Sequence, residues 1–181
     1  EYCDAAGAHL CGTVHDFSTR LLGGVCGISG LFSHVPDLQR FLRAMLAAAS
    51  GEQGGVFDAG WVRDSLRVQT GTLSPSRGLF WHPAAGTAPQ DDIWCHLGFT
   101  GTAMWLSPRR GRYAVLLTNK LYYTREFDRI NDIRRPACAS AEAAPPATPA
   151  SLPSCRLGER RPCAAADHPR RRFSEHSDFL Q

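Results

Sequence analysis

The stretch from Ile93 to Asn119 constrains the fold more than any other part of this chain. It reads as a strand, a turn punctuated by glycines, a second strand, a tight turn and a third strand. Thr102 to Ser107 and Arg112 to Thr118 form the arms of a hairpin, because Pro108 to Gly111 has the proline and glycine that tight turns favour. The second arm contains the nearly all-apolar run YAVLLT, which predicts a strand buried on both faces. We therefore expect an antiparallel sheet at the centre of the fold.

Apolar residues at helical spacing predict helices before and after this sheet. The clearest apolar face combines positions i, i+3, i+4, i+7 and i+8, namely Leu38, Phe41, Leu42, Met45 and Leu46. Before the sheet we expect a loop over Glu1 to Cys11, an irregular glycine-rich loop over Val14 to Ser33, and a helix that Ser33 caps and that ends at Gly51 to Gly55. A second helix is expected over Trp61 to Val68, capped by Asp58, with Trp61, Val62 and Leu66 toward the core. A strand over Arg77 to His82 and a loop over Ala84 to Asp92 should lead into the sheet, and a helix over Thr124 to Cys138 should follow it.

The character of the chain changes at Ala139. From there the sequence is rich in alanine, proline and arginine and has no apolar period. Such a segment buries too little apolar surface to offset the entropy of ordering it. We predict a folded part over residues 1–138 and a disordered tail over residues 139–181. Out-of-frame translation of a GC-rich gene is a second interpretation of the tail.

Composition excludes several classes of protein. A formal net charge of +3 is too small to predict a nucleic-acid partner. Seven cysteines, an odd count without a C-x-x-C pair, favour neither a disulfide framework nor a zinc module. No apolar run reaches the ~18 residues of a membrane span, and Glu1 does not open a signal peptide. The chain starts abruptly, so we expect an upstream part.

Two blocks of sequence resemble the β-lactamase-related serine hydrolases, a family that includes penicillin-binding proteins, class C β-lactamases and esterases. The later block has His96-Leu97-Gly98, then FTG, a W-L-x-P hairpin and LLTN, and is similar to the family's third motif region. The earlier block, Gly12 to Leu42, resembles the G-x-VHD…LGGV-x-G…GLFS…DL-x-RF segment. Leu97, Ile28 and Phe80 depart from the hydroxyl residue, histidine and glycine often found in relatives. The resemblance implies an α/β (α+β) fold, the C-terminal part of a β-lactamase/transpeptidase-like domain, with an antiparallel sheet flanked by helices.

The same resemblance implies roles for four consecutive residues. His96 takes the basic position, where it would position or protonate the substrate and lend positive field. Leu97 and Gly98 would line the substrate site, with Gly98 leaving the strand edge bare for an acyl group. The backbone N–H of Phe99 would be one of two oxyanion-hole donors, each typically worth about 3–4 kcal/mol. A histidine bonded to the backbone at a strand end is the structural alternative for His96.

The motifs that carry the family's nucleophile are missing from these residues. Lys120 is the only lysine, and Leu117 stands three positions before it, so no S-x-x-K occurs. No tyrosine has asparagine two positions on, so Y-x-N is missing too. We expect both motifs upstream. The resemblance then implies a portion of a serine hydrolase that acts on an ester, amide or β-lactam through an acyl-serine, with a small acyl substrate as partner and no cofactor or metal. Family members are often extracytoplasmic.

Four other hypotheses stay open at this level. An inactive fragment or a binding protein that keeps part of the fold is the main alternative. Ser29 in the GISG run, with His15 and Asp16, could form a self-contained triad, although triads are assembled in space rather than along the sequence. A nucleic-acid binder could use the tail arginines Arg170 to Arg172, which solvation explains equally well.

A zinc site is conceivable from two cysteine and histidine pairs. Cys11 and His15 could supply two ligands, and Cys95 and His96 two more. Neighbouring residues on a strand point to opposite faces, which argues against one ion held by both Cys95 and His96.

Overall fold

The fold was analysed in a computed structural model of the whole chain, which describes residues 2–3, 7–87, 91–122 and 128–143. The chain divides into two compact units, Glu1–Thr148 and Pro149–Gln181. All described residues lie in the first unit. The predicted tail therefore lies outside the described residues, apart from its first few positions.

A four-stranded antiparallel sheet forms the centre of this unit, in the order β3-β4-β5-β6. Its strands are β3 (His82–Pro83), β4 (Trp94–Leu97), β5 (Ala103–Ser107) and β6 (Arg112–Leu116). The three strands and two turns predicted between residues 93 and 119 are confirmed. The hairpin register pairs Ser107 with Arg112 around the proline-containing turn.

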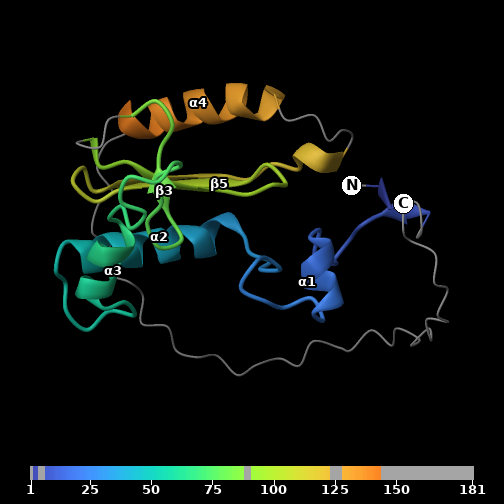
Figure 1. Cartoon of the computed structure of the whole chain (residues 1–181), viewed down its shortest axis with the longest axis horizontal. Helices are drawn as coiled ribbons and strands as arrows, with labels where there is room; N and C mark the ends of the chain where they lie inside the picture. Colours follow the sequence, from blue (N-terminus) through green and yellow to red (C-terminus); the bar gives the residue numbers. More distant parts are fainter. Residues whose placement is uncertain (1, 4–6, 88–90, 123–127, 144–181) are drawn as a thin grey trace. The chain divides into compact units, whose positions relative to one another are not determined.

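Helices cover both faces of the sheet (Figure 1). On one side lie α2 (Val35–Ala49) and α3 (Ala59–Ser65), and on the other lies α4 (Asp128–Ala143). The remaining short elements are β1 (Tyr2–Cys3), β2 (Ala8–His9), α1 (Phe17–Leu21) and the 3-10 helix η3 (Lys120–Tyr122). Helices plus an antiparallel sheet are what the sequence predicted.

Each face of the sheet has its own hydrophobic core, because side chains alternate along the strands. The core under α2 and α3 contains Leu42, Met45, Ala48, Val62, Leu66, Trp81, Trp94 and Leu106. The core under α4 contains Ala84, Ile93, Cys95, Ala103 and Trp105, with Ala137 and Cys138 of the helix packed against it. The apolar face predicted for α2 is confirmed at its centre, since Leu42 and Met45 are both fully buried.

Of the two helix N-caps predicted from the sequence, one is confirmed and one is wrong. Asp58 caps α3 as predicted, accepting a hydrogen bond of 2.8 Å from the N–H of Trp61. The prediction of Ser33 as the cap of α2 is wrong by one residue. His34 is the N-cap, and its Nδ1 accepts from the N–H of Asp37 at 3.3 Å. A histidine ring nitrogen can accept the capping hydrogen bond that a serine hydroxyl oxygen usually accepts.

Several predicted elements need correction. The strand expected over residues 77–82 is reduced to His82–Pro83, because Gly78 to Trp81 forms a turn closed by a 2.8 Å bond from the N–H of Gly78 to the carbonyl of Trp81. The loops expected before residue 33 contain β1, β2 and the short helix α1. The last helix runs beyond Cys138 to Ala143, while its expected start falls outside the described residues.

Two burial predictions are also wrong. Trp61 is 48% exposed, although Val62 and Leu66 of the same segment are buried as expected. The strand predicted to be buried on both faces, β6, is half-buried throughout and ends at Leu116. It packs against α2 on one face and α4 on the other, but its only sheet neighbour among the described strands is β5. A position at the sheet edge explains why its residues keep partial exposure.

Candidate functional site

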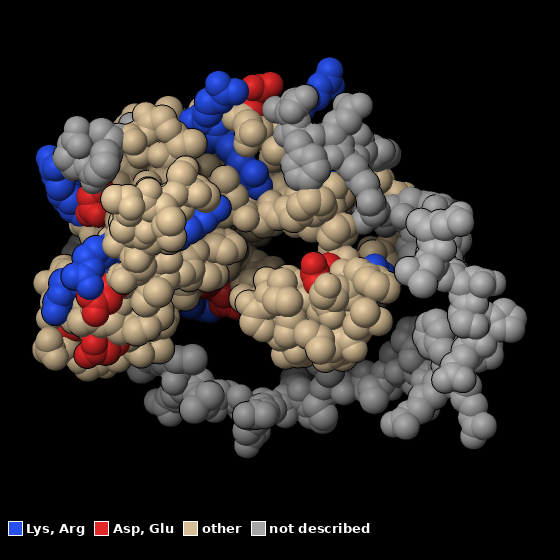
Figure 2. Space-filling view, viewed as in Figure 1, with Lys and Arg blue, Asp and Glu red and all other residues tan. Residues whose placement is uncertain are grey.

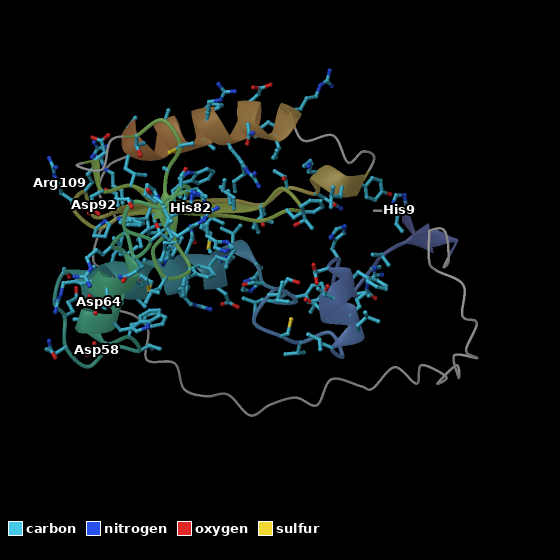
Figure 3. All side chains as sticks on the ribbon, in the orientation of Figure 1. His9, Asp58, Asp64, His82, Asp92 and Arg109 are labelled. Atoms are coloured by element: carbon cyan, nitrogen blue, oxygen red, sulfur yellow. The ribbon has the colours of Figure 1, made fainter. Side chains whose placement is uncertain are left out.

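The four residues singled out from the sequence lie at the end of β4 and the start of the turn that follows it. His96 is paired with Met104 and Leu97 with Ala103 across the sheet. His96 shares its face with Trp94, on the side of α2, whereas Leu97 shares the α4 side with Cys95. Figure 3 shows His82, from the neighbouring strand, among the side chains at the sheet. Thus only one of the two side chains, that of His96, faces the α2 side.

His96 is covered by an aromatic ring. The phenyl ring of Phe80 stacks on the imidazole, with ring centroids 4.0 Å apart and planes 8° from parallel. Burial lowers the pKa of His96, and the nearby His82 and Arg77 lower the pKa further when they carry charge. Burial therefore favours the neutral imidazole, and the positive field that the resemblance implies for His96 requires protonation against this effect.

Gly98 opens a tight turn that connects β4 to β5. Its N–H donates to the carbonyl of Thr102 at 2.8 Å, and its own carbonyl accepts from the N–H of Gly101 at 3.1 Å. A Cβ at position 98 would collide with the Thr102 hydroxyl, so any other residue here would force the Thr102 side chain to shift. The turn thereby holds the peptide between Gly98 and Phe99 in a defined place.

Phe99 lies exposed at this turn and brings together distant parts of the chain. Its ring stacks against His15 at a centroid distance of 5.4 Å, and the Nζ of Lys120 lies 5.5 Å from the ring centroid. The two sequence blocks that carry the resemblance thus meet at Phe99. Lys120, the only lysine of the chain, was not assigned to the site from the sequence. Its position directly after LLTN was the available signal.

The sequence also missed Arg134, which was placed only on the amphipathic last helix. From α4 its Nη2 donates to the carbonyl of Gly98 at 2.7 Å and to the carbonyl of Thr102 at 2.9 Å. A side chain 36 residues away from Gly98 along the chain therefore bridges the two residues at which the turn begins and ends. No spacing rule connects these positions.

The Ser29 triad is not supported by the geometry. Ser29 Oγ lies 2.8 Å from the buried hydroxyl of Thr19. The Asp16 carboxylate caps α1 by accepting from the N–H of Thr19 at 2.7 Å, which lowers the pKa of Asp16. His15 stacks on Phe99. Each member has a structural role apart from the others.

The zinc hypothesis also lacks support. Cys95 and His96 point to opposite faces of the sheet, and Cys11 is exposed. The partner of Cys95 is His82, with 3.3 Å between Sγ and Nδ1, and burial raises the pKa of the Cys95 thiol to about 12. Within the described ranges, no three histidine, cysteine or acidic side chains gather as a metal would require.

Surface charge and helix length concern two kinds of partner, nucleic acids and membranes. In Figure 2, lysine and arginine side chains form small scattered groups on a visible face that is mostly made of other residues, so no continuous basic surface is seen there. Among the helices of the described residues, none is both long and apolar enough to cross a membrane.

Comparison with known proteins agrees with the resemblance. The family model described as Beta-lactamase matches residues 4–139, so the chain belongs to the β-lactamase family. It is 29% identical over 120 residues to a protein of Escherichia coli (strain K12) described as "Putative D-alanyl-D-alanine carboxypeptidase", covering 61% of this chain and 27% of the relative. A protein of the same description from Escherichia coli O157:H7 is 29% identical over 118 residues, covering 60% of this chain and 27% of the relative. The chain thus spans about a quarter of these relatives' length. No solved structure matches it.

Proposed function

We propose that this chain forms the third-motif wall of a serine hydrolase site that acts on an ester, amide or β-lactam through an acyl-serine. The observation that carries the proposal is the place of His96-Leu97-Gly98 at the end of a sheet strand, followed by a turn in which Gly98 lies close against Thr102. In this proposal the N–H of Phe99 donates to the oxyanion, and His96 and Gly98 face the acyl group. Membership of the family supports the assignment.

The lowered pKa of His96 refines its proposed role. A neutral imidazole near pH 7 can accept or donate one proton, so it suits proton transfer or a hydrogen bond to the substrate. The ammonium Nζ of Lys120 lies 5.5 Å from the centroid of the Phe99 ring. In our proposal Lys120, rather than His96, supplies the positive field at this wall. The nucleophilic serine and its lysine are contributed from outside these 181 residues, which contain no S-x-x-K.

The second candidate is a binding protein or inactive portion that keeps the fold. Two observations favour it. Leu97 replaces the hydroxyl residue of the family motif, and its side chain packs on the α4 side with Cys95 and Ala103. The ring of Phe80 also covers His96. Both changes would weaken contacts with a substrate without disturbing the sheet.

Substrate binding and covalent reaction are tested separately. The ¹⁵N-labelled chain is titrated with benzylpenicillin while the Phe99 amide and the His96 ring signals are followed. We expect saturable shifts at both, weakened by His96→Ala and unchanged by the matched control His34→Ala, whose side chain is 64% exposed. Shifts absent from the β4–β5 turn would contradict the proposal and favour the binding-protein alternative with another ligand.

Covalent labelling tests the assignment of the nucleophile. The chain is treated with a fluorescent penicillin and a fluorophosphonate probe, alongside Ser29→Ala. We expect neither probe to label either protein, because the proposed nucleophile lies elsewhere. Labelling that disappears in Ser29→Ala would make the GISG loop the active site and overturn the roles assigned to His96 and Phe99.

A further inference from the structure

Arg134 ties the β4–β5 turn to the helix on the opposite side of the sheet from His96. One of its nitrogens, Nη2, donates to both the carbonyl of Gly98 and the carbonyl of Thr102, at 2.7 and 2.9 Å. The same two carbonyls take the turn's own backbone hydrogen bonds, from the N–H groups of Gly101 and Gly98 respectively. The guanidinium therefore bridges the two carbonyls that close the turn.

This contact fixes the direction of the neighbouring N–H. The only cis peptide among the described residues is Ser74-Pro75, so the peptide from Gly98 to Phe99 is trans. In a trans peptide the carbonyl and the following N–H point in opposite directions. Because Arg134 donates to the Gly98 carbonyl, the N–H of Phe99 at the other end of the same peptide points away from the guanidinium.

The charge of Arg134 also acts on this peptide. A guanidinium stays protonated at any working pH, and hydrogen bonds with one charged partner are roughly twice as strong as neutral ones. A cation on the carbonyl draws electrons from the amide, so the N–H at the other end becomes a better donor. The hydrogen-bond acceptors that face Arg134 in the described structure are these two carbonyls, not a carboxylate that would neutralise it.

We infer that Arg134 is a positioning residue of the acyl site, which orients and polarises the Phe99 N–H as an oxyanion donor through the Gly98 carbonyl. The inference rests on the proposed function, since it needs an acyl carbonyl to meet that N–H. Arg134 itself touches no substrate. The inferred role of Arg134 does not involve a carboxylate on the substrate, so an uncharged ester is the appropriate probe.

The test compares Arg134→Gln and Arg134→Lys with two matched controls on the same helix. Arg135→Gln removes an exposed arginine that pairs with Asp132 at 3.0 Å. Ile130→Val removes buried volume at a residue 5% exposed, which lowers stability without removing a hydrogen-bond donor to the turn. Lysine keeps the charge but cannot reproduce the planar donor geometry of the guanidinium.

Two readouts are taken from each labelled protein. The first is the Gly98 carbonyl ¹³C shift and the Phe99 amide shift without ligand. The second is the affinity for p-nitrophenyl butyrate, measured from the Phe99 amide. We expect Arg134→Gln to move both unliganded shifts and to weaken ester binding about tenfold, a loss that fits one weakened charge-assisted hydrogen bond. Arg134→Lys should recover part of the affinity, and both controls should bind like the wild type.

Each outcome supports or overturns the inference. If the wild type binds the ester and Arg134→Gln binds it equally well, the positioning role is wrong while the proposed function stands. If the Ile130→Val control loses as much affinity as Arg134→Gln, the role of Arg134 is only structural. If the wild type shows no ester response at Phe99, the proposed function fails and the inference fails with it. If Arg134→Gln does not fold, Arg134→Lys decides by the same two readouts.

Discussion

Phe80 lies flat against His96, and its own backbone adopts the left-handed conformation to do so. The two ring centroids are 4.0 Å apart, and φ of Phe80 is 71°. A residue with a side chain holds that conformation at a cost of about 1–2 kcal/mol. Packing against Trp81, edge to face at 5.1 Å, helps to offset the strain. The strained residue is therefore the one that shields the candidate site's histidine.

Replacing Phe80 with glycine should uncover His96. Burial is the largest cause of the lowered pKa, so Phe80→Gly is expected to raise the pKa of His96 toward its ordinary value. The measurement is an NMR titration of the His96 ring protons. Leu79→Gly, at an adjacent position that is 45% exposed, serves as the control and should leave the pKa in place. An unchanged His96 pKa in Phe80→Gly would mean that the sheet, not the phenyl ring, shields the imidazole.

Acidification should destabilise the fold through three partly buried histidines. Burial lowers the pKa values of His96, His82 and His15. Between the folded-state pKa and the unfolded value of about 6.5, the unfolded chain binds more protons, so the free energy of unfolding falls as the pH falls. We therefore expect Tm to drop as the pH falls through the unfolded value of about 6.5 toward the lowered folded-state pKa values.

Variants show whether the histidines cause that drop. The decrease in Tm should be smaller in His96→Gln and smaller again when His82→Gln is added, as calorimetry at several pH values can measure. A pH dependence identical in all three proteins would assign the effect to other groups.

Gly98→Ala should disturb the turn by overpacking. The added methyl group would meet the Thr102 hydroxyl, and such overpacking typically costs about 1–3 kcal/mol. Adding Thr102→Ala removes the obstacle and should recover most of the loss, which chemical denaturation of a double-mutant cycle can quantify. Gly55→Ala, where a Cβ meets nothing within 4 Å, is the matched control. Additive losses in the double variant would show that the methyl group clashes elsewhere.

Leu42→Ala should be the most damaging of these substitutions. Leu42 is fully buried in the core between α2 and the sheet, and truncation of a buried leucine costs about 2–5 kcal/mol. Leu31→Ala, at a residue 89% exposed, should leave Tm nearly unchanged. Thermal unfolding followed by circular dichroism distinguishes the two. Equal stability of Leu42→Ala and the wild type would contradict the packing described for this core.

Local chemistry explains which parts of the fold could be predicted. The turn from Pro108 to Gly111 fixes a hairpin because its residues prefer that backbone, and Asp58 caps α3 because the acceptor and the donor are three residues apart. The failed strand over residues 77–82 shows the limit. The pattern favoured extension there, but Phe80 has positive φ, which no propensity indicates.

By itself the sequence determined the antiparallel sheet, the apolar face of α2 and the position of His96, Leu97, Gly98 and Phe99 at one strand end. These features depend on neighbours along the chain. Tertiary structure alone decided that Phe80 covers His96, that His15 meets Phe99, and that Arg134 holds the Gly98 carbonyl. Periodicity tells which face of an element is apolar, but the reach of a side chain to a distant turn depends on how the elements pack.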